Sequence, residues 1–214
     1  MPLLFLIRHG ENDYTHKGKL AGRLPGVHLN ARGREQAAAL AETLGVLPLK
    51  AVYASPLERA IETAQPLAEA RRLEVTVLPE LLEIDVGRWQ GRTLKSLRRT
   101  KAWRMVQEAP SRAGFPEGET FHQAQARVVA ALEDILARHR PKDALAVFFH
   151  ADPIKLAVAH YIGLPLDFFQ RLHVETGSVT ALAVGERGVR LLWLNRVPPF
   201  SVASLSRKRG ARPK

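Results

Sequence analysis

The sequence contains no cysteine, which excludes disulfide bonds and any zinc or redox site built on thiolates. It also has no apolar stretch long enough to span a membrane. Its first apolar run is too short for the core of a secretion signal, and no basic residues precede it. We therefore expect a cytoplasmic protein that does not associate with membranes.

Acidic side chains are in the minority, because 21 Asp and Glu residues are set against 32 Lys and Arg residues, leaving a formal net charge of +11. Five of the basic residues lie at positions 207–214, and removing these five charges from +11 leaves about +6. A basic surface favours anionic substrates or nucleic acid. We expect residues 1–200 to form a single domain and residues 201–214 to form a basic, disordered tail.

An uninterrupted apolar run at residues 3–7 is followed at once by Arg8, His9 and Gly10. The shortness of the run and the glycine after it favour a buried strand over an amphipathic helix. In open α/β sheets, ligands bind at the carboxyl ends of the strands. Arg8 and His9 therefore form a candidate anion site, with His9 expected at an exposed strand end.

A second segment repeats this arrangement. A strand predicted at residues 50–54 leads into a helix whose start is marked by Ser55 as N-cap, Pro56 at the first helical position and Glu58 as capping-box partner. This start places Arg59 in the first turn, where backbone N–H groups and a guanidinium together favour an anion.

A third segment, at residues 144–149, is apolar throughout and ends in His150. Asp152 and Pro153 are expected to begin the helix that follows, with the Asp152 carboxylate turned toward the helix backbone. The remaining expected elements are helices at 30–44, 93–107 and 120–136, a strand at 74–78, a hairpin of 178–184 with 189–194, and a loop at 14–29. The alternation of strands and helices predicts an α/β fold with a mostly parallel sheet, in which the strand ends lie together.

Four motifs, taken in order, resemble those of the histidine phosphatase superfamily, also called the phosphoglycerate mutase-like family. They are Arg8-His9-Gly10, the Ser-Pro-Leu-Glu-Arg-Ala segment at 55–60, the Glu83 to Gly91 segment around Trp89, and His150. The resemblance implies a three-layer α/β/α sandwich around a mostly parallel central sheet, with a small cap inserted around residues 91–120. It also implies hydrolysis of a phosphate ester through a phosphohistidine, without a cofactor or a metal.

The resemblance assigns a role to each motif. His9 is the expected nucleophile, Glu83 the general acid, and Arg8, Arg59 and His150 the groups that hold the phosphate, with the protonation state of His150 left open. Further expected phosphate contacts are Asn12, Thr15 and Gly22, and which of Asn12 and Thr15 makes the contact is left open. Candidate contacts to the rest of the substrate are Arg23, Trp89, Trp103, Phe115 and Glu119.

Several alternatives stand beside this interpretation. Asp85 and Glu11 compete with Glu83 as the acid. A phosphomutase of the same family would need a more closed cap than the short segment at 91–120 predicts, and a non-enzymatic phosphate or nucleic-acid binder would leave the catalytic set unused. A zinc site would have two arginines aimed at it, which disfavours a cation. The expected partners are a small phosphate ester and, if the protein is a homodimer, a second copy of the chain.

Overall fold

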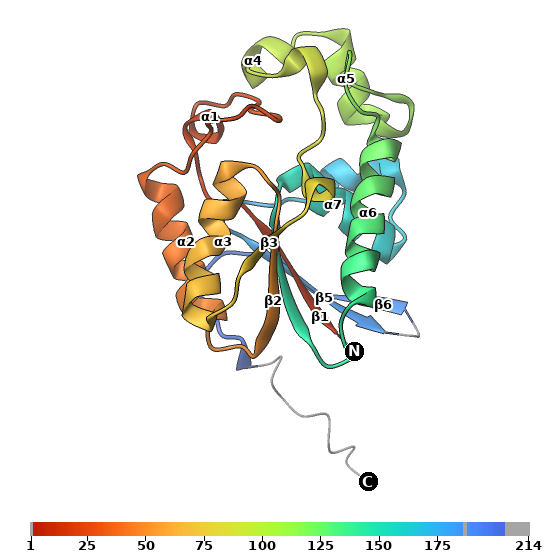
Figure 1. The fold of residues 1–214 in the computed structure, drawn as a ribbon. Helices are drawn as coiled ribbons and strands as arrows, with labels where there is room; N and C mark the ends of the chain where they lie inside the picture. The colour runs from red at the N-terminus through yellow and green to blue at the C-terminus, as the bar shows by residue number, and fades with distance from the viewer. Residues whose placement is uncertain (1, 186–187, 204–214) are drawn as a thin grey trace.

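The computed structural model describes residues 2–185 and 188–203, and its centre is a six-stranded sheet in the order β3-β2-β4-β1-β5-β6 (Figure 1). The strands are β1 (Leu3–Arg8), β2 (Leu49–Ala54), β3 (Val75–Val77), β4 (Ala144–Phe149), β5 (Val179–Gly185) and β6 (Gly188–Arg196). The first four strands are parallel, β5 runs antiparallel to β1, and β6 forms a hairpin with β5. The structure confirms the expected α/β fold and its mostly parallel sheet.

Helices cover both faces of the sheet. The two larger pairs are α2 (Ala31–Leu44) with α3 (Glu58–Arg71), and α6 (Phe121–Ala137) with α7 (Ala151–Ile162). Alternate residues of β1 point to opposite faces, so Phe5 packs in the cluster that contains Leu40 of α2, whereas Leu4 packs with Leu132 of α6. Figure 1 shows the resulting three layers, with α2 and α3 on one side of the sheet and α6 on the other.

Two of the expected helix starts are confirmed. The Asn30 side chain accepts from the Gly33 N–H at the start of α2, and Thr120 with Gln123 forms a capping box at the start of α6.

The capping predictions for α3 and α7 were wrong. α3 has Leu57 as its N-cap without a side-chain cap, because the Ser55 hydroxyl contacts His150 and the Glu58 carboxylate accepts from the Gly26 N–H instead. α7 likewise begins after His150 with no side-chain cap, and Asp152 lies in its first turn. In both cases a polar side chain that could cap the helix has another partner: Ser55 contacts His150, which is distant in sequence, whereas Asp152 pairs with Lys155 of its own helix.

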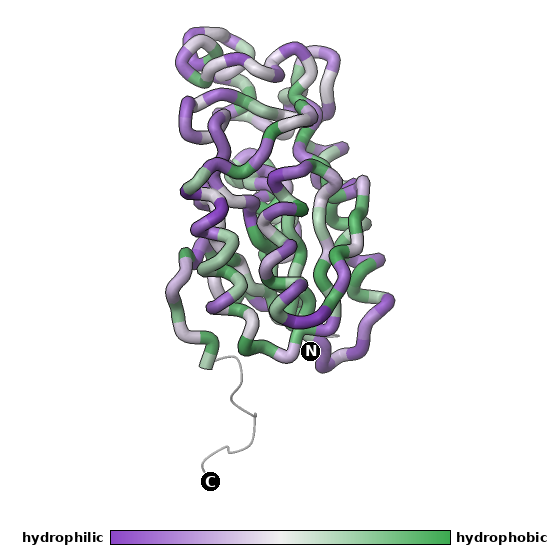
Figure 2. Tube along the Cα trace, turned by 60° about the vertical axis from the view of Figure 1, so that its left-hand side comes forward, coloured by the Kyte–Doolittle hydropathy of each residue, from purple (hydrophilic) through white to green (hydrophobic). Residues whose placement is uncertain are grey.

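The end of the molecule beyond the carboxyl edge of the sheet carries short helices (Figure 1). They are α1 (Asp13–His16), α4 (Leu94–Leu97) and α5 (Lys101–Glu108), with 3₁₀ turns at Pro79–Leu81, Gly87–Trp89, Pro110–Arg112 and Leu166–Arg171. The single helix expected at 93–107 is divided, because the Thr100 hydroxyl accepts from the Trp103 N–H and starts α5 anew. The short helix α1 occupies the start of the segment at 14–29 that was expected to be a loop. This end is more hydrophilic than the sheet and its flanking helices (Figure 2).

In the ranges that the structure describes, no helix is long and apolar enough to cross a membrane. Residues 204–214 of the expected basic tail lie outside these ranges.

Candidate active site

The carboxyl ends of β1 and β4 bring two histidines together. These strands are parallel neighbours in which Arg8 pairs with Phe149, and the His9 N–H donates to the Phe149 carbonyl at 3.0 Å. His9 and His150 each follow directly after these strands, and their ring centroids are 5.2 Å apart. The convergence predicted from the strand order is therefore present.

The His9 ring is held in one tautomer. Its Nδ1 lies 2.7 Å from the Gly10 carbonyl oxygen, which can only accept, so Nδ1 carries the proton and Nε2 has a free lone pair. His9 is buried rather than exposed, with 3% of its surface accessible. Burial, followed by the charges of Arg59 and Arg8, holds its pKa well below the ordinary value. The imidazole is consequently neutral and nucleophilic.

Close backbone packing fixes the turn that carries His9. A Cβ on Gly10 would lie 2.6 Å from the Gly33 carbonyl oxygen, and a Cβ on Gly33 would lie 2.1 Å from the Glu11 carbonyl oxygen. The Gly10 N–H also donates to the Thr63 hydroxyl of α3 at 2.9 Å. Only glycine permits this approach of the turn to the start of α2, which accounts for the glycine after the histidine.

Arginine N–H groups point into the site without protein partners. Arg8 donates from Nη1 to the Val174 carbonyl, and Arg59, which is 1% exposed, donates from Nη2 to the Gly22 carbonyl, each at 2.7 Å. The buried Arg8 Nε and Arg59 Nε and Nη1 atoms have no hydrogen-bond partner within the described chain. Buried donors of this kind are almost always satisfied, so these three groups indicate an anion that binds between the two side chains.

Asn12 and Thr15 differ in what they have left to donate. The Thr15 hydroxyl donates to the Asn12 carbonyl and accepts from the Asn12 N–H, while the Asn12 Oδ1 caps α1 by accepting from the N–H groups of Tyr14 and Thr15. The Asn12 Nδ2 atom is buried and has no partner in the described residues. Asn12 is therefore the better candidate for an anion contact.

The protonation state of His150 was left open by the sequence, and its surroundings in the structure favour the neutral form. Burial, followed by the charges of Arg59, His9 and Arg8, lowers its pKa well below the ordinary value. Its Nδ1 lies 3.4 Å from Arg59 Nη2, which can only donate, and its Nε2 lies 2.9 Å from the Ser55 hydroxyl. A phosphate dianion bound beside Arg8 and Arg59 would supply negative charge, and this charge would stabilise the protonated form of His150.

Glu83 is the carboxylate that faces the two arginines. Burial, and then the charge of Asp152, raises the pKa of Glu83 to about 7, against the opposing effects of the Ile84 N–H, Arg59 and Arg8. Asp85 has a different environment, because it accepts from the Gly87 N–H within its own turn and lies 3.7 Å from Arg23. Glu83 can thus carry a proton near neutral pH and the Asp85 carboxylate is directed elsewhere.

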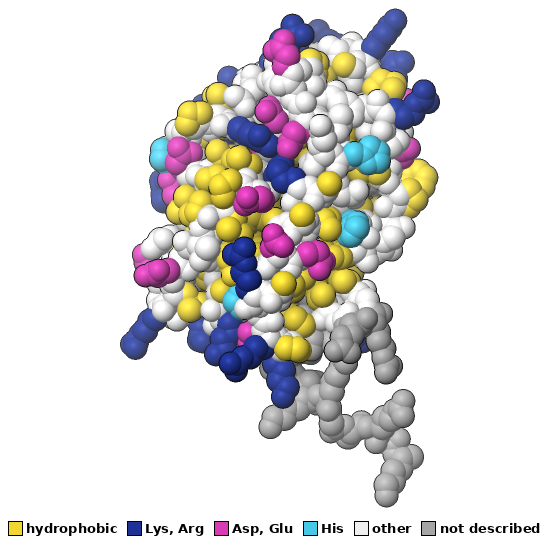
Figure 3. Space-filling model, turned by 45° about the vertical axis from the view of Figure 1, so that its right-hand side comes forward, with side chains coloured by type: hydrophobic (Ala, Val, Ile, Leu, Met, Phe, Trp, Pro, Cys, Tyr) yellow, Lys and Arg dark blue, Asp and Glu magenta, His cyan; other side chains and the backbone are white. Residues whose placement is uncertain are grey.

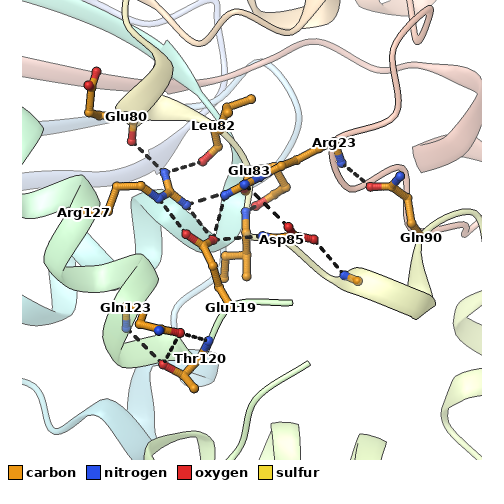
Figure 4. A network of polar contacts seen from close by, with 12 residues as sticks. Arg23, Glu80, Leu82, Glu83, Asp85, Gln90, Glu119, Thr120, Gln123 and Arg127 are labelled. Carbon is orange, nitrogen blue, oxygen red and sulfur yellow. Dashed lines mark hydrogen bonds and ion pairs between the residues drawn. The ribbon is translucent and has the colours of Figure 1, made fainter. Parts of the chain in front are cut away.

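A network of ion pairs holds the Glu83 backbone (Figure 4). The Glu119 carboxylate accepts from Arg127 Nε and Nη2 at 2.8 Å and from Arg23 Nη2 at 2.9 Å. Arg23 Nε in turn donates to the Glu83 carbonyl at 2.8 Å. Arg23 and Glu119, expected as substrate contacts, are therefore engaged with each other and position the Glu83 segment. Arg127 completes the network, and no motif in the sequence marked it.

We expect Glu119→Gln to lower the free energy of unfolding by about 1–3 kcal/mol, because the amide accepts fewer hydrogen bonds and leaves partly buried arginines unpaired. Glu117→Gln is the matched control. Glu117 pairs with Arg88, and both side chains are about two-thirds exposed (67% and 70%), so its loss should cost less than about 0.5 kcal/mol. Urea unfolding of both variants checks this; equal losses would argue against a structural role for the network.

Of the aromatic residues expected at the substrate, Trp89 and Phe115 are buried in an apolar cluster, and the partly buried Trp103 packs against it. Trp89 is 4% exposed and stacks on Trp103 with ring centroids 5.9 Å apart, and Phe115 packs edge-on against Trp89 at 5.3 Å. They belong to an apolar cluster under the short helices, which also contains Phe121 and Phe169. This packing explains why the segment after Glu83 carries a tryptophan.

The cavity at the strand ends has a volume of about 190 Å³. The residues expected at the site that line it are Arg8, His9, Asn12, Thr15, Gly22, Arg59 and Glu83. The lining also includes Asp152 and residues that were not expected at the site: Gly18, Lys19, Leu20, Ala21, Ile84, Val86 and Leu94. In the described residues, no group of three or more His, Asp or Glu side chains could hold a metal ion.

Asp152 lines this cavity, which corrects the expectation that it turns toward the helix backbone. Lys155 holds it in place, with Nζ 2.6 Å from the Asp152 carboxylate and 2.7 Å from the Gln170 Oε1 atom. Lys155 is itself buried, at 9% exposed. The negative charge of Asp152 therefore has a fixed place near Glu83 and contributes to the raised pKa of that carboxyl group.

Asp152→Asn should move the alkaline limb of the pH–rate profile to lower pH. If protonated Glu83 is the acid, activity falls as the pH rises through the pKa of about 7. Removing the Asp152 charge favours ionised Glu83, so its pKa falls and the acid form is lost earlier. The measurement is kcat against pH with an alkyl phosphate. An unshifted limb, or a shift to higher pH, would contradict this assignment.

Comparisons with known proteins agree with this geometry. The model of the histidine phosphatase superfamily (branch 1) matches residues 4–197. The chain is 31% identical over 197 residues to phosphoserine phosphatase 1 of Hydrogenobacter thermophilus, with 91% of this chain and 92% of that protein covered. It is 29% identical over 185 residues to the 2,3-bisphosphoglycerate-dependent phosphoglycerate mutase of Thermoplasma acidophilum, with 86% and 88% covered.

Among solved structures, the mycobacterial glucosyl-3-phosphoglycerate phosphatase in complex with VO3 superposes with a TM-score of 0.82 at 28% identity, covering 91% of this chain and 99% of that one. The family match spans nearly the whole chain, and the motifs that carried the resemblance converge at one edge of the sheet. The chain belongs to the histidine phosphatase superfamily, branch 1.

Proposed function

We propose that this protein is a phosphomonoesterase that hydrolyses a small phosphorylated metabolite through a phosphohistidine on His9. The observation that carries the proposal is the His9 ring, whose Nδ1–H donates to Gly10 and whose free Nε2 lines a cavity with unpaired guanidinium N–H groups. Relatives named as phosphatases, including the phosphoserine phosphatase, support hydrolysis.

In the first step, His9 Nε2 attacks phosphorus and the bond to the ester oxygen breaks. Glu83 gives its proton to the leaving oxygen, so the alcohol departs neutral. The N–H groups of Arg8, Arg59 and Asn12 hold the three remaining phosphoryl oxygens and stabilise the charge in the transition state. The product of this step is a phosphoramidate on Nε2 and an ionised Glu83.

In the second step, the Glu83 carboxylate takes a proton from water while the water oxygen attacks phosphorus. The bond between phosphorus and Nε2 breaks, inorganic phosphate leaves, and both His9 and Glu83 return to their starting forms. A pKa of about 7 for Glu83 suits a group that acts as an acid in one step and as a base in the next.

Mutase activity is the second candidate, and the similarity to a phosphoglycerate mutase favours it. A mutase must exclude water while the phosphohistidine waits for a second hydroxyl. The segment at 91–120, which we propose acts as a small cap, is short, and Lys19 on the cavity wall is exposed to solvent. A short cap favours hydrolysis over transfer.

The test is release of inorganic phosphate from a panel of phosphoserine, 3-phosphoglycerate, sugar phosphates and glycerol phosphate, with and without a chelator. We expect hydrolysis of at least one ester at a rate that the chelator leaves unchanged. Phosphate transfer without release would establish the mutase, and activity restored only by added zinc or magnesium would overturn the metal-free mechanism.

A further inference from the structure

Gln36 of α2 joins two segments that lie next to the nucleophile. Its Oε1 accepts from the Glu11 N–H at 2.8 Å, and its Nε2 donates to the Thr176 carbonyl at 3.0 Å and to the Thr176 hydroxyl at 3.1 Å. Glu11 follows His9 and Gly10 directly, whereas Thr176 is 140 positions from Gln36 in the sequence. One partly buried side chain therefore holds two distant parts of the chain against the same helix.

Residues 176–178 in turn support the end of β1. The Gly177 N–H donates to the His9 carbonyl at 3.1 Å and to the Arg8 carbonyl at 3.2 Å. The Arg8 N–H donates to the Ser178 carbonyl at 3.1 Å. The segment that the glutamine holds thus fixes the backbone of the nucleophile and of the arginine before it.

The side chain of Gln36 also sets the distance between α2 and this segment. A Cβ placed on Gly177 would lie 2.9 Å from the Cβ of Gln36 and 3.2 Å from both its Cγ and its Cδ. Gly177 is buried, and its backbone packs along the glutamine side chain without room for another group. Both the length of this side chain and its amide group therefore determine where the segment lies.

A second contact between α2 and the His9 turn lies on the same face of the helix. Gly33 comes three residues before Gln36, and its backbone packs against that of Gly10 and Glu11. Gln36 itself lies outside the lining of the catalytic cavity. Any effect of Gln36 on the reaction must therefore pass through the residues that it holds.

We propose that Gln36 is a positioning residue for the nucleophile, which keeps His9 Nε2 in line with the phosphorus atom of the bound ester. This inference rests on the proposed phosphomonoesterase activity. In-line attack depends steeply on the position of the nucleophile, and a misplacement of about 1 Å can lower the rate by about 10²-fold. Binding of the phosphate is less sensitive, because Arg59 lies on α3 and is fixed by its own hydrogen bond to the Gly22 carbonyl.

The experiment measures single-turnover phosphoryl transfer in Gln36→Met, with the best ester of the metabolite panel and with a nitrophenyl phosphate. Methionine keeps the length and bulk of the side chain but cannot donate to Thr176, so packing against Gly177 is kept while the hydrogen bonds are lost. We expect the rate constant to fall about 10- to 100-fold, by the same factor for both substrates. The inhibition constant of inorganic phosphate, which reports binding alone, should change by less than about threefold.

The single-turnover rate constant does not depend on the fraction of the protein that is folded, so destabilisation alone would leave it unchanged. Thr176→Val tests the same contact from the other side. It removes the hydroxyl but keeps the carbonyl that accepts from Gln36. We expect the same rate constant to fall by a smaller factor, about two- to fivefold.

Gln125→Met is the matched control. Gln125 is also partly buried, and its Nε2 donates to the Leu156 carbonyl at 3.0 Å, which joins α6 to α7. The surface carries charged side chains of both signs (Figure 3), and a change in their number would alter the attraction of an anionic substrate. Neither glutamine variant changes the net charge. The control should leave the rate constant within about twofold of the wild type.

A rate constant within about twofold of the wild type in Gln36→Met, or an equal loss in Gln125→Met, would overturn the proposal. A loss confined to the ester with the poorer leaving group would also overturn it, because Gln36 would then act on the general acid and not on the nucleophile. Absence of phosphate release from every ester by the wild type would instead refute the phosphomonoesterase assignment.

Discussion

Replacing His9 by asparagine is expected to lower phosphate release by at least about 10⁴-fold while the protein remains folded. The asparagine amide can still donate to the Gly10 carbonyl, as His9 Nδ1 does at 2.7 Å, so the turn keeps its hydrogen bond. What is lost is Nε2, the protein atom that forms the bond to phosphorus in the first step. Steady-state release of inorganic phosphate measures the effect, and circular dichroism checks the fold.

His160→Asn provides the control for the general effect of removing an imidazole. His160 is exposed on α7, away from the strand ends, and this change should leave activity within about twofold of the wild type. If His9→Asn retained activity within about tenfold of the wild type, His9 would not be the nucleophile.

Glu83→Gln is expected to separate substrates by their leaving groups. Glutamine keeps the size of the side chain but cannot donate an acidic proton, so hydrolysis of an alkyl phosphate should fall by about 10² to 10⁴-fold. A nitrophenyl phosphate should be much less affected in its first step, since its leaving group departs readily as the anion. Single-turnover measurements with both substrates isolate this step.

Asp85→Asn is the matched carboxylate control, and it should show no selective loss with the alkyl phosphate. The Asp85 carboxylate accepts from the Gly87 N–H and lies beside Arg23. The variant therefore alters contacts within a turn and leaves the proposed proton donor in place. Equal losses for the two substrates in Glu83→Gln, or a selective loss in Asp85→Asn, would show that Glu83 is not the general acid.

The parallel strands, and the proximity of the residues at their carboxyl ends, could be predicted because both follow from the pattern of apolar runs and intervening helices in the sequence. The apolar runs at 3–7 and 144–149 form strands, as expected; β1 continues one residue beyond its run to Arg8, and β4 ends at the last residue of its run, Phe149. Once the strands are parallel neighbours, chain geometry alone brings His9 beside His150. The family motifs then suggest a role in the reaction for each of these two side chains.

The parts that could not be predicted depend on which of several available partners each side chain takes in the folded chain. Ser55 and Asp152 both occupy positions where a cap is chemically reasonable, yet one contacts His150 and the other pairs with Lys155. Trp89 and Trp103 are as compatible with a binding site as with a core, and only their stacking decides between the two. The charge pattern of the sequence also does not show that His150 is buried, and it is burial that lowers the pKa of His150 and favours its neutral form.

The most direct test of the mechanism is to trap the phosphoenzyme and locate the phosphoryl group. Glu83→Gln would be mixed with a ³²P-labelled nitrophenyl phosphate, because the first step is then little affected while the missing base slows hydrolysis of the intermediate. We expect label approaching one phosphoryl group per chain, stable to alkali, labile to acid, and found on the peptide that contains His9. Nitrophenol release in that variant with no label, or with label on any other residue, would contradict a phosphohistidine at His9.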